Sequence, residues 1–225
     1  MISVLIPAAG SGERFGADDP KALVTVAGRP MLAWCVEVLS RVPGVGEILV
    51  AAPPSARAIF ESVRTELGIA AWREIVEGGQ TRSESVRNLL GEAEGSRVLV
   101  HDAARPCITT DWVTELLKEL KDDAAGVPAL PVRDTLKRGR YGLVTETVSR
   151  AGLYSVQTPQ VFDTTLLRRA HAPEVEWTAD PSDDAMLVEA LGEDVRLLGG
   201  KTWNLKVTYP GDQALAEVII GDRSR

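Results

Sequence analysis

A glycine-rich loop with two nearby cations follows the first apolar segment of the chain. Residues 7–16 read PAAGSGERFG, and residues 18–21 read DDPK. Small residues let backbone N–H groups approach an anion closely, Arg14 offers a planar two-pronged donor, and Lys21 offers a point charge. The loop therefore indicates a phosphate site. The alternative is a tight strand-to-helix turn whose two cations are only solvated.

The glycine spacing does not fit the two commonest nucleotide-binding loops. A dinucleotide-binding loop reads G-x-G-x-x-G, whereas Gly10, Gly12 and Gly16 give G-x-G-x-x-x-G. A P-loop continues with Lys and Ser or Thr after its last glycine, but Ala17 and Asp18 follow Gly16 here. The pattern therefore favours an anion-binding loop of another type.

A second glycine-containing segment, GGQTRSES at residues 78–85, offers contacts for a nucleobase. Its glycines permit close approach of a flat ring, and its hydroxyl groups provide adaptable hydrogen bonds. The alternative is a glycine turn that leads into a capped helix, with Thr81 as N-cap and Glu84 at the capping-box position. That alternative explains Thr81 but leaves Arg82 unexplained.

A third polar segment, HDAARP at residues 101–106, follows a buried apolar run. A carboxylate in that position, Asp102, is well placed to hold Mg²⁺, which prefers carboxylate, phosphate and water oxygens. We expect Arg105 to pair with Asp102 and to orient it. We expect His101 to be a packed residue at the strand end rather than a general base.

The elements that must position these loops alternate along the first half of the chain. Short apolar runs predict strands, and amphipathic stretches between them predict helices. Alternation of this kind predicts an α/β fold with a parallel sheet covered on both faces, and such folds bind ligands beyond the carboxyl ends of their strands. The predicted strands are 2–6, 47–52, 72–76 and 97–101; the predicted helices are 31–39, a stretch ending at Leu67, 81–90, and one capped by Thr110 or Asp111 that runs to Leu120.

The pattern changes after residue 124. Residues 127–132 are apolar with two prolines, and residues 133–150 alternate polar and β-favouring residues around Gly139 and Gly142. This alternation predicts a hairpin arm, at 133–152, which packs on a partner subunit because it cannot bury both faces within its own domain. Helices are predicted at 165–170 and 182–191, a strand at 195–198, and a closing helix from Pro210 to Ile220.

Composition limits the functions that the chain can perform. Its 225 residues suit a single domain, 1–225, with the arm inserted in it. A net charge of −7 argues against broad nucleic-acid binding, although a few converging cations can still hold a small phosphorylated ligand. The first apolar run is too short for a signal peptide or membrane span, and Cys35 and Cys107 lack metal-type spacing. We therefore expect a cytoplasmic protein with no membrane partner and with buried, reduced cysteines.

Several segments together resemble one enzyme family. PAAGSGERFG with DPK, then GGQTRSESV, VHDAARP, PVRDTLK, QTPQVF and WNLKVT occur in the order seen in 2-C-methyl-D-erythritol 4-phosphate cytidylyltransferases, enzymes of the non-mevalonate isoprenoid pathway. The resemblance runs from Pro7 to Asp212, and VHDAARP and PVRDT are its most specific parts. It implies a Rossmann-like nucleotidyltransferase fold with a mostly parallel, mixed sheet and a projecting β-hairpin that makes a homodimer.

The resemblance also implies roles for individual residues, with CTP and methylerythritol phosphate as substrates and Mg²⁺ or another divalent cation held by Asp102. The catalytic cations would be Arg14, Lys21 and Lys206. The CTP site would contain Pro7, Ala8, Ala9, Gly10, Gly12, Gly78, Gly79, Ser85, Asp102 and Ala103. The acceptor site would contain Arg105, Thr158 and Ser182, with Thr135 and Arg150 supplied by the neighbouring subunit.

Two positions depart from the family pattern, and other functions stay open. Ala22 stands where a glutamine is common, and Asp184 shortens an acid in the usual Thr-Asp-Glu-Ala; we expect neither change to touch the cations. The nearest alternative is a cytidylyltransferase for another polyol phosphate, such as ribitol 5-phosphate. More distant alternatives are a sugar-1-phosphate nucleotidyltransferase and a catalytically silent nucleotide-binding module, although the latter predicts erosion of cations that are all present.

Overall fold

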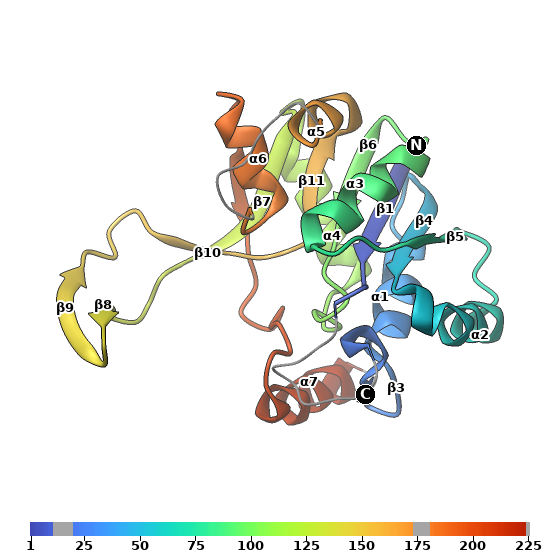
Figure 1. Cartoon of the computed structure of the whole chain (residues 1–225), viewed down its shortest axis with the longest axis horizontal. Helices are drawn as coiled ribbons and strands as arrows, with labels where there is room; N and C mark the ends of the chain where they lie inside the picture. Colours follow the sequence, from blue (N-terminus) through green and yellow to red (C-terminus); the bar gives the residue numbers. More distant parts are fainter. Residues whose placement is uncertain (11–19, 173–180, 224–225) are drawn as a thin grey trace.

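The centre of the molecule is a mixed eight-stranded sheet (Figure 1). The structure, a computed structural model, describes residues 1–10, 20–172 and 181–223. The strand order is β10-β7-β11-β6-β1-β4-β5, and β12 pairs with β7. The strands are β1 (Ile2–Pro7), β4 (Val45–Ala52), β5 (Trp72–Glu77), β6 (Arg97–Val100), β7 (Ala125–Pro131), β10 (Tyr154–Val156), β11 (Gln160–Asp163) and β12 (Arg196–Gly199).

Most of the sheet is parallel, as the sequence predicts. β1 pairs in parallel with β4 and β6, β4 with β5, and β12 with β7. β11 lies antiparallel between β6 and β7, and β10 runs antiparallel to β7. Neither antiparallel strand is predicted from the sequence, because runs of three and four residues on either side of Pro159 are too short to show a period.

Helices cover both faces of the sheet, which gives three layers. Val4 and Ile6 of β1 face a core built by α1 (Met31–Ser40), α2 (Arg57–Leu67) and α4 (Thr110–Leu120). Leu5, which points the other way, packs with α3 (Arg82–Glu92), α5 (Thr164–Ala170) and α6 (Asp184–Ala190). Both faces of β1 are buried, which explains why all of its residues except Ser3 are apolar.

Two predicted helix starts need correction. Thr109, rather than Thr110 or Asp111, caps α4 by accepting the Trp112 N–H at 3.3 Å; the Thr110 hydroxyl instead donates to the Val38 carbonyl at 3.1 Å. Likewise, α6 begins at Asp184 with Asp183 as its N-cap, so Ser182 precedes the helix. Neighbouring hydroxyl and carboxylate residues offer equivalent caps, and only tertiary contacts decide between them.

The predicted cap of α3 is correct in its main feature. The Thr81 hydroxyl accepts the Glu84 N–H at 3.1 Å. The Glu84 carboxylate, however, accepts the N–H of Gln80 at 2.6 Å, one residue before the position that a capping box predicts. The turn and the first helical residues are therefore tied together on both sides.

The predicted hairpin arm stands away from the rest of the chain (Figure 1). It consists of β8 (Leu136–Arg140) and β9 (Leu143–Val148), which among the described residues pair only with each other. Tyr141 and Leu143 at its tip are 88% and 73% exposed. A two-stranded ribbon with such exposed apolar side chains is marginally stable on its own.

The C-terminal helix α7 (Pro210–Arg223) lies below the sheet in Figure 1. Its Ala216 packs with Val26, of the short strand β2 (Thr25–Val26), which pairs with β3 (Arg29–Pro30). Cys35 and Cys107 are fully buried, as predicted. Within the described parts of the chain, we find no helix with the length and apolarity that crossing a membrane requires.

Candidate functional site

Two adjoining pockets lie beyond the carboxyl ends of β1, β5 and β6, where the sequence predicts ligand binding. The first has a volume of about 350 Å³ and the second about 240 Å³. The first is lined by Pro7, Ala8, Ala9, Gly10, Lys21, Ala22, Gly79, Gln80, Thr81, Arg82, Ser85, Asp102, Ala103, Ala104 and Lys206. The second is lined by Arg82, Asp102, Arg105, Val156, Gln157, Thr158, Gln160, Ser182, Asp183 and Lys206.

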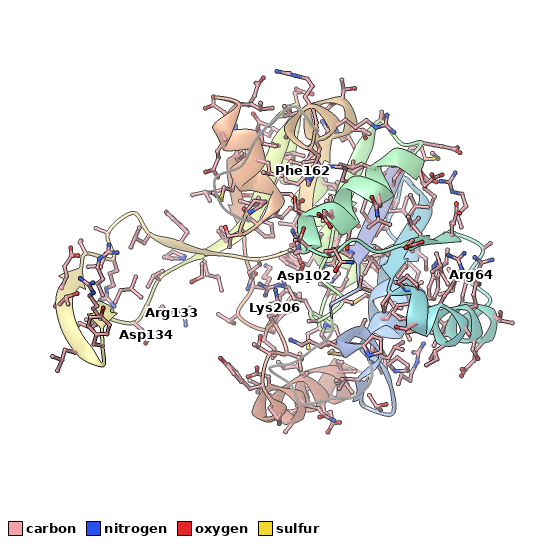
Figure 2. All side chains as sticks on the ribbon, in the orientation of Figure 1. Arg64, Asp102, Arg133, Asp134, Phe162 and Lys206 are labelled. Carbon is pink, nitrogen blue, oxygen red and sulfur yellow. The ribbon has the colours of Figure 1, made fainter. Side chains whose placement is uncertain are left out.

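The wall between the two pockets consists of charged side chains that line both. Lys206 Nζ lies 2.7 Å from Asp102 Oδ2, and Arg82 Nε lies 3.1 Å from Asp102 Oδ1. Figure 2 shows Asp102 and Lys206 together in the middle of the molecule. The Asp102 carboxylate is therefore held from both sides by cations that come from distant parts of the sequence.

The cations keep Asp102 ionised. Burial by itself raises the pKa of this carboxyl, but Arg82 and Lys206 more than offset that effect and hold the pKa well below its usual range. The prediction that Arg105 pairs with Asp102 is wrong. Arg105 donates instead to the carbonyl groups of Asn204 at 2.9 Å and Val156 at 3.4 Å, so its guanidinium braces the second pocket.

Arg82 is the main site residue to which the sequence patterns assign no role. Its Nη1 lies 2.7 Å from Oδ2 of the buried Asp184, whose Oδ1 faces His171 Nε2 at 3.0 Å. The shortened acid at Asp184 thus contacts Arg82, a cation that the predicted set of Arg14, Lys21 and Lys206 does not include. The sequence does contain a signal for the role of Arg82. This residue begins α3, and a cation is disfavoured at a helix N-terminus unless an anion lies nearby.

His101 is packed as predicted, and its imidazole is neutral. It is fully buried, and burial lowers its pKa from 6.5 to about 4. Its Nε2 faces the Arg105 carbonyl at 3.2 Å, so Nε2 carries the proton and Nδ1 accepts from the Thr158 hydroxyl at 3.1 Å. Thr158 in turn accepts the Asp102 N–H at 3.1 Å. This chain of bonds fixes the backbone at Asp102.

The segment that carries Lys206 is neither helix nor strand and is fixed by buried amides. The Gln157 Nε2 donates to the Lys201 carbonyl at 2.9 Å, and the Asn204 Nδ2 donates to the Thr158 carbonyl at 2.9 Å. The Val207 N–H donates to the Ala104 carbonyl at 2.8 Å. Lys206 is thus held between two attachments to the strand ends.

The glycines of the second segment bring chain segments together. A Cβ on Gly78 would lie 2.2 Å from the Ala9 Cβ and 3.3 Å from the Ala52 carbonyl oxygen. Gly78 does not line either pocket. Its lack of a side chain lets the loop that carries Ala9 pack close to the end of β5. The Ser85 hydroxyl accepts the Gly79 N–H at 3.1 Å and donates to the Thr81 carbonyl at 3.0 Å, so it shapes the first pocket.

The structure gathers most of the predicted site residues at the pockets. Thr135 and Arg150 are on the arm and line neither pocket; Arg150 donates to the Arg133 carbonyl, and Figure 2 shows Arg133 where the arm leaves the body. Gly12 and Arg14 lie outside the described residues. Those at the first pocket are Pro7, Ala8, Ala9, Gly10, Lys21, Gly79, Ser85, Asp102, Ala103 and Lys206, and those at the second are Asp102, Arg105, Thr158, Ser182 and Lys206.

Asp102 suits a magnesium ion only as a partial ligand. The described residues contain no group of three or more acidic, histidine or cysteine side chains arranged to hold a metal. Mg²⁺ commonly takes one or two carboxylates and completes its shell with substrate phosphates and water. Asp102 is ionised, and each of its oxygens retains a lone pair beyond the one used by Arg82 or Lys206. The donor set therefore fits Mg²⁺ that arrives with a phosphate ligand.

The three-layer fold, the small-residue loop after β1 and the cationic double pocket define a nucleotidyltransferase. A sequence profile of the 2-C-methyl-D-erythritol 4-phosphate cytidylyltransferase (IspD) family matches residues 2–222. The chain belongs to this family.

Named relatives and solved structures support the same family assignment. The chain is 45% identical over 219 residues to the Deinococcus radiodurans protein of that name, covering 97% of this chain and 89% of the relative. It is 38% identical over 223 residues to the Synechococcus elongatus protein, covering 98% and 96%. A crystal structure of the Thermus thermophilus enzyme superposes with a TM-score of 0.80 at 37% identity, covering 96% of this chain and 98% of that one.

Proposed function

We propose that this chain transfers the cytidylyl group of CTP to 2-C-methyl-D-erythritol 4-phosphate. The products are 4-diphosphocytidyl-2-C-methyl-D-erythritol and pyrophosphate, and the reaction serves isoprenoid precursor biosynthesis. The observation that carries the proposal is the wall of Arg82, Asp102 and Lys206 between two pockets. A transfer between two anionic substrates needs two adjoining sites with cations where they meet.

The nucleotide occupies the first pocket in this proposal. Backbone groups of residues 7–10 lie against the phosphates, and Gly79 and Ser85 border the base. Lys21, Lys206 and Arg14, the last from the glycine-rich loop that begins at Pro7, neutralise the triphosphate. Asp102 holds Mg²⁺, which when bound supplies further charge neutralisation at the phosphates.

The acceptor occupies the second pocket, beside Arg105, Thr158 and Ser182. One of its phosphate oxygens attacks the α-phosphorus of CTP in line with the leaving group. A bond forms between that oxygen and the α-phosphorus, the bond to the β-phosphate oxygen breaks, and pyrophosphate leaves with the electron pair. The nucleophile is already ionised at neutral pH, so no general base is required, in keeping with the buried and neutral His101.

We extend the proposal to the assembly. The arm, residues 133–152 of a single domain, joins two copies of the chain into a homodimer. Thr135 and Arg150 then reach the acceptor pocket of the partner subunit, which explains why neither lines a pocket of its own chain. The enzyme works in the cytoplasm, without nucleic-acid or membrane partners.

Pyrophosphate release tests the proposal directly. The purified protein is incubated with CTP, Mg²⁺ and either methylerythritol phosphate or ribitol 5-phosphate. Release with the first acceptor and not the second is expected. Release only with ribitol 5-phosphate would assign the enzyme to another polyol phosphate, and no release with either would reject cytidylyl transfer to both.

A further inference from the structure

Arg82 bridges two carboxylates that come from different parts of the fold. Its Nε contacts Asp102 at 3.1 Å, and its Nη1 contacts Asp184 at 2.7 Å. The Asp184 side chain is only 1% exposed, and its second oxygen faces His171. The guanidinium is therefore fixed at one end in the interior, while its other end reaches the wall between the two pockets.

The two cations on Asp102 differ in how firmly they are held. The Lys206 ammonium is a point charge on a flexible stem, and its side chain is 43% exposed. Arg82 has a planar fork whose two contacts leave little freedom for the group. When a phosphate enters, Lys206 can exchange Asp102 for the phosphate, whereas Arg82 cannot turn without also leaving Asp184.

We propose that Arg82, anchored by Asp184, is a positioning residue that keeps the Asp102 carboxylate in place when Lys206 turns to the substrate phosphates. The inference rests on the proposed function and adds a residue to it. Arg82 acts through Asp102 and needs no bond of its own to substrate.

A purely structural link between α3 and α6 is the competing explanation. It accounts for the bond between Arg82 and Asp184, which belong to those two helices. It does not account for the bond from Nε to Asp102 at the pocket wall. The two explanations differ in whether the effect of Arg82 on turnover depends on Asp102.

A double-mutant cycle separates them. Arg82→Gln, Asp102→Asn and the double variant are compared with the unaltered chain in single-turnover pyrophosphate formation, and CTP dissociation constants are measured by calorimetry. Substitution of a group that orients a ligand typically costs about 10- to 100-fold. We expect that loss in rate for Arg82→Gln, with a smaller change in CTP affinity. The double variant should be no slower than Asp102→Asn alone.

Arg73 provides a matched control. It also bridges two carboxylates, Glu47 and Glu94, with a side-chain exposure of 33% against 30% for Arg82, but at the opposite end of the sheet. Arg73→Gln should leave the rate unchanged while losing similar ion pairs. If Arg82→Gln does not fold, Arg82→Lys enters the same cycle, because one ammonium cannot reproduce the fork that holds both carboxylates.

Two results would overturn the inference. One is a rate for the Arg82 variant within twofold of the unaltered chain. The other is additivity, in which the double variant loses the product of the two single losses. Either result with an active unaltered chain rejects only the role of Arg82, whereas an inactive unaltered chain rejects the proposed function itself.

Discussion

The Lys206 ammonium and the Asp102 carboxylate, 104 positions apart in sequence, lie 2.7 Å apart at the junction of the two pockets. Lys206 comes from an irregular segment near the C-terminus, and Asp102 follows β6. Without ligand each neutralises the other. A phosphate that enters either pocket offers Lys206 a second anion, so substrate binding should change the pairing between Lys206 and Asp102.

Replacing Lys206 with Met should lower turnover by about 10²- to 10³-fold, the typical cost of removing one preorganised charge partner. The methionine keeps much of the side-chain volume, so only the charge is lost. Steady-state kinetics with both substrates measure the effect. Lys201→Met is the control, because Lys201 lies in the same segment with a similar exposure of 41% but pairs weakly with Glu115 at 3.9 Å. Equal losses in both variants would contradict a specific role for Lys206.

Lys21 lines the first pocket but not the second, so its loss should affect the two substrates differently. Lys21→Ala should cripple turnover and weaken CTP binding, while binding of the acceptor changes little. Arg14→Ala is expected to behave in the same way. Calorimetric titration with CTP, together with thermal unfolding to verify the fold, measures this. Near-normal turnover in either variant would refute charge stabilisation by the glycine-rich loop.

Sequence patterns revealed the three-layer fold because its strands are buried on both faces and its helices are amphipathic. They also located the loops after β1, β5 and β6, since parallel strands bring their carboxyl ends to one edge. They did not reveal β11, which is four residues long and inserts antiparallel between β6 and β7. Only the complete sheet shows that this strand, and not β7, is the neighbour of β6.

Ion-pair partners were harder to predict than site membership. Arg105 is only three residues from Asp102 in sequence, yet Arg82 and Lys206 occupy both carboxylate oxygens. Side-chain direction at a strand end depends on the neighbouring segments, here Asn204 and Val156, which draw Arg105 away. Proximity in sequence is therefore a poor guide to pairing at the junction of several loops.

The stability of the protein should fall as the pH drops from 6.5 to 4. The pKa of the buried His101 falls from 6.5 to about 4, so in this interval the unfolded chain binds a proton that the folded chain does not. The free energy of unfolding should therefore decrease over this window by about 3 kcal/mol, and no further from this group below it. Urea denaturation across the pH range measures the slope.

His101→Asn supplies the control for that slope. Asparagine keeps an acceptor for the Thr158 hydroxyl, but it does not titrate and leaves the Arg105 carbonyl without its donor. The variant should be less stable at pH 7 and should show a flatter dependence between pH 6.5 and 4. An unchanged slope would mean that other groups cause the acid sensitivity.

Gly78→Ala should damage CTP binding although Gly78 does not line the pocket. The new Cβ would overlap with Ala9 Cβ at 2.2 Å and press on the Ala52 carbonyl at 3.3 Å, so the loop that carries Ala9 must move. Overpacking of this kind costs about 1–3 kcal/mol in stability, and a displaced loop weakens contacts to phosphate. The dissociation constant of CTP should rise while that of the acceptor stays near its original value.

Gly91→Ala is the matched control, since a Cβ at this exposed position of α3 meets nothing within 4 Å. Alanine is favoured over glycine by about 1 kcal/mol in a helix interior and by less in the last turn, where Gly91 lies, so this variant should be as stable as the unaltered chain or slightly more so and should bind CTP normally. If Gly78→Ala also bound CTP normally, the proposed position of the nucleotide beside the Ala9 loop would be wrong.

The proposed role of the arm in the partner subunit can be tested by mixing two variant chains. If Arg150 serves the acceptor pocket of a partner subunit, Arg150→Ala should raise KM for the acceptor much more than for CTP. A mixture of Arg150→Ala and Lys206→Met chains should then regain activity. In each mixed dimer one pocket has Lys206 intact and receives an intact arm, while the other carries both defects.

Free exchange of equal amounts gives mixed dimers in half of the population, so about a quarter of the original activity should return. Light scattering would establish the dimer, and each variant alone would set the background. Recovery that appears on mixing demonstrates arm exchange between subunits. If dimers exchange chains but activity stays at the background, Arg150 acts within its own chain or not at all, and the cross-subunit assignment fails.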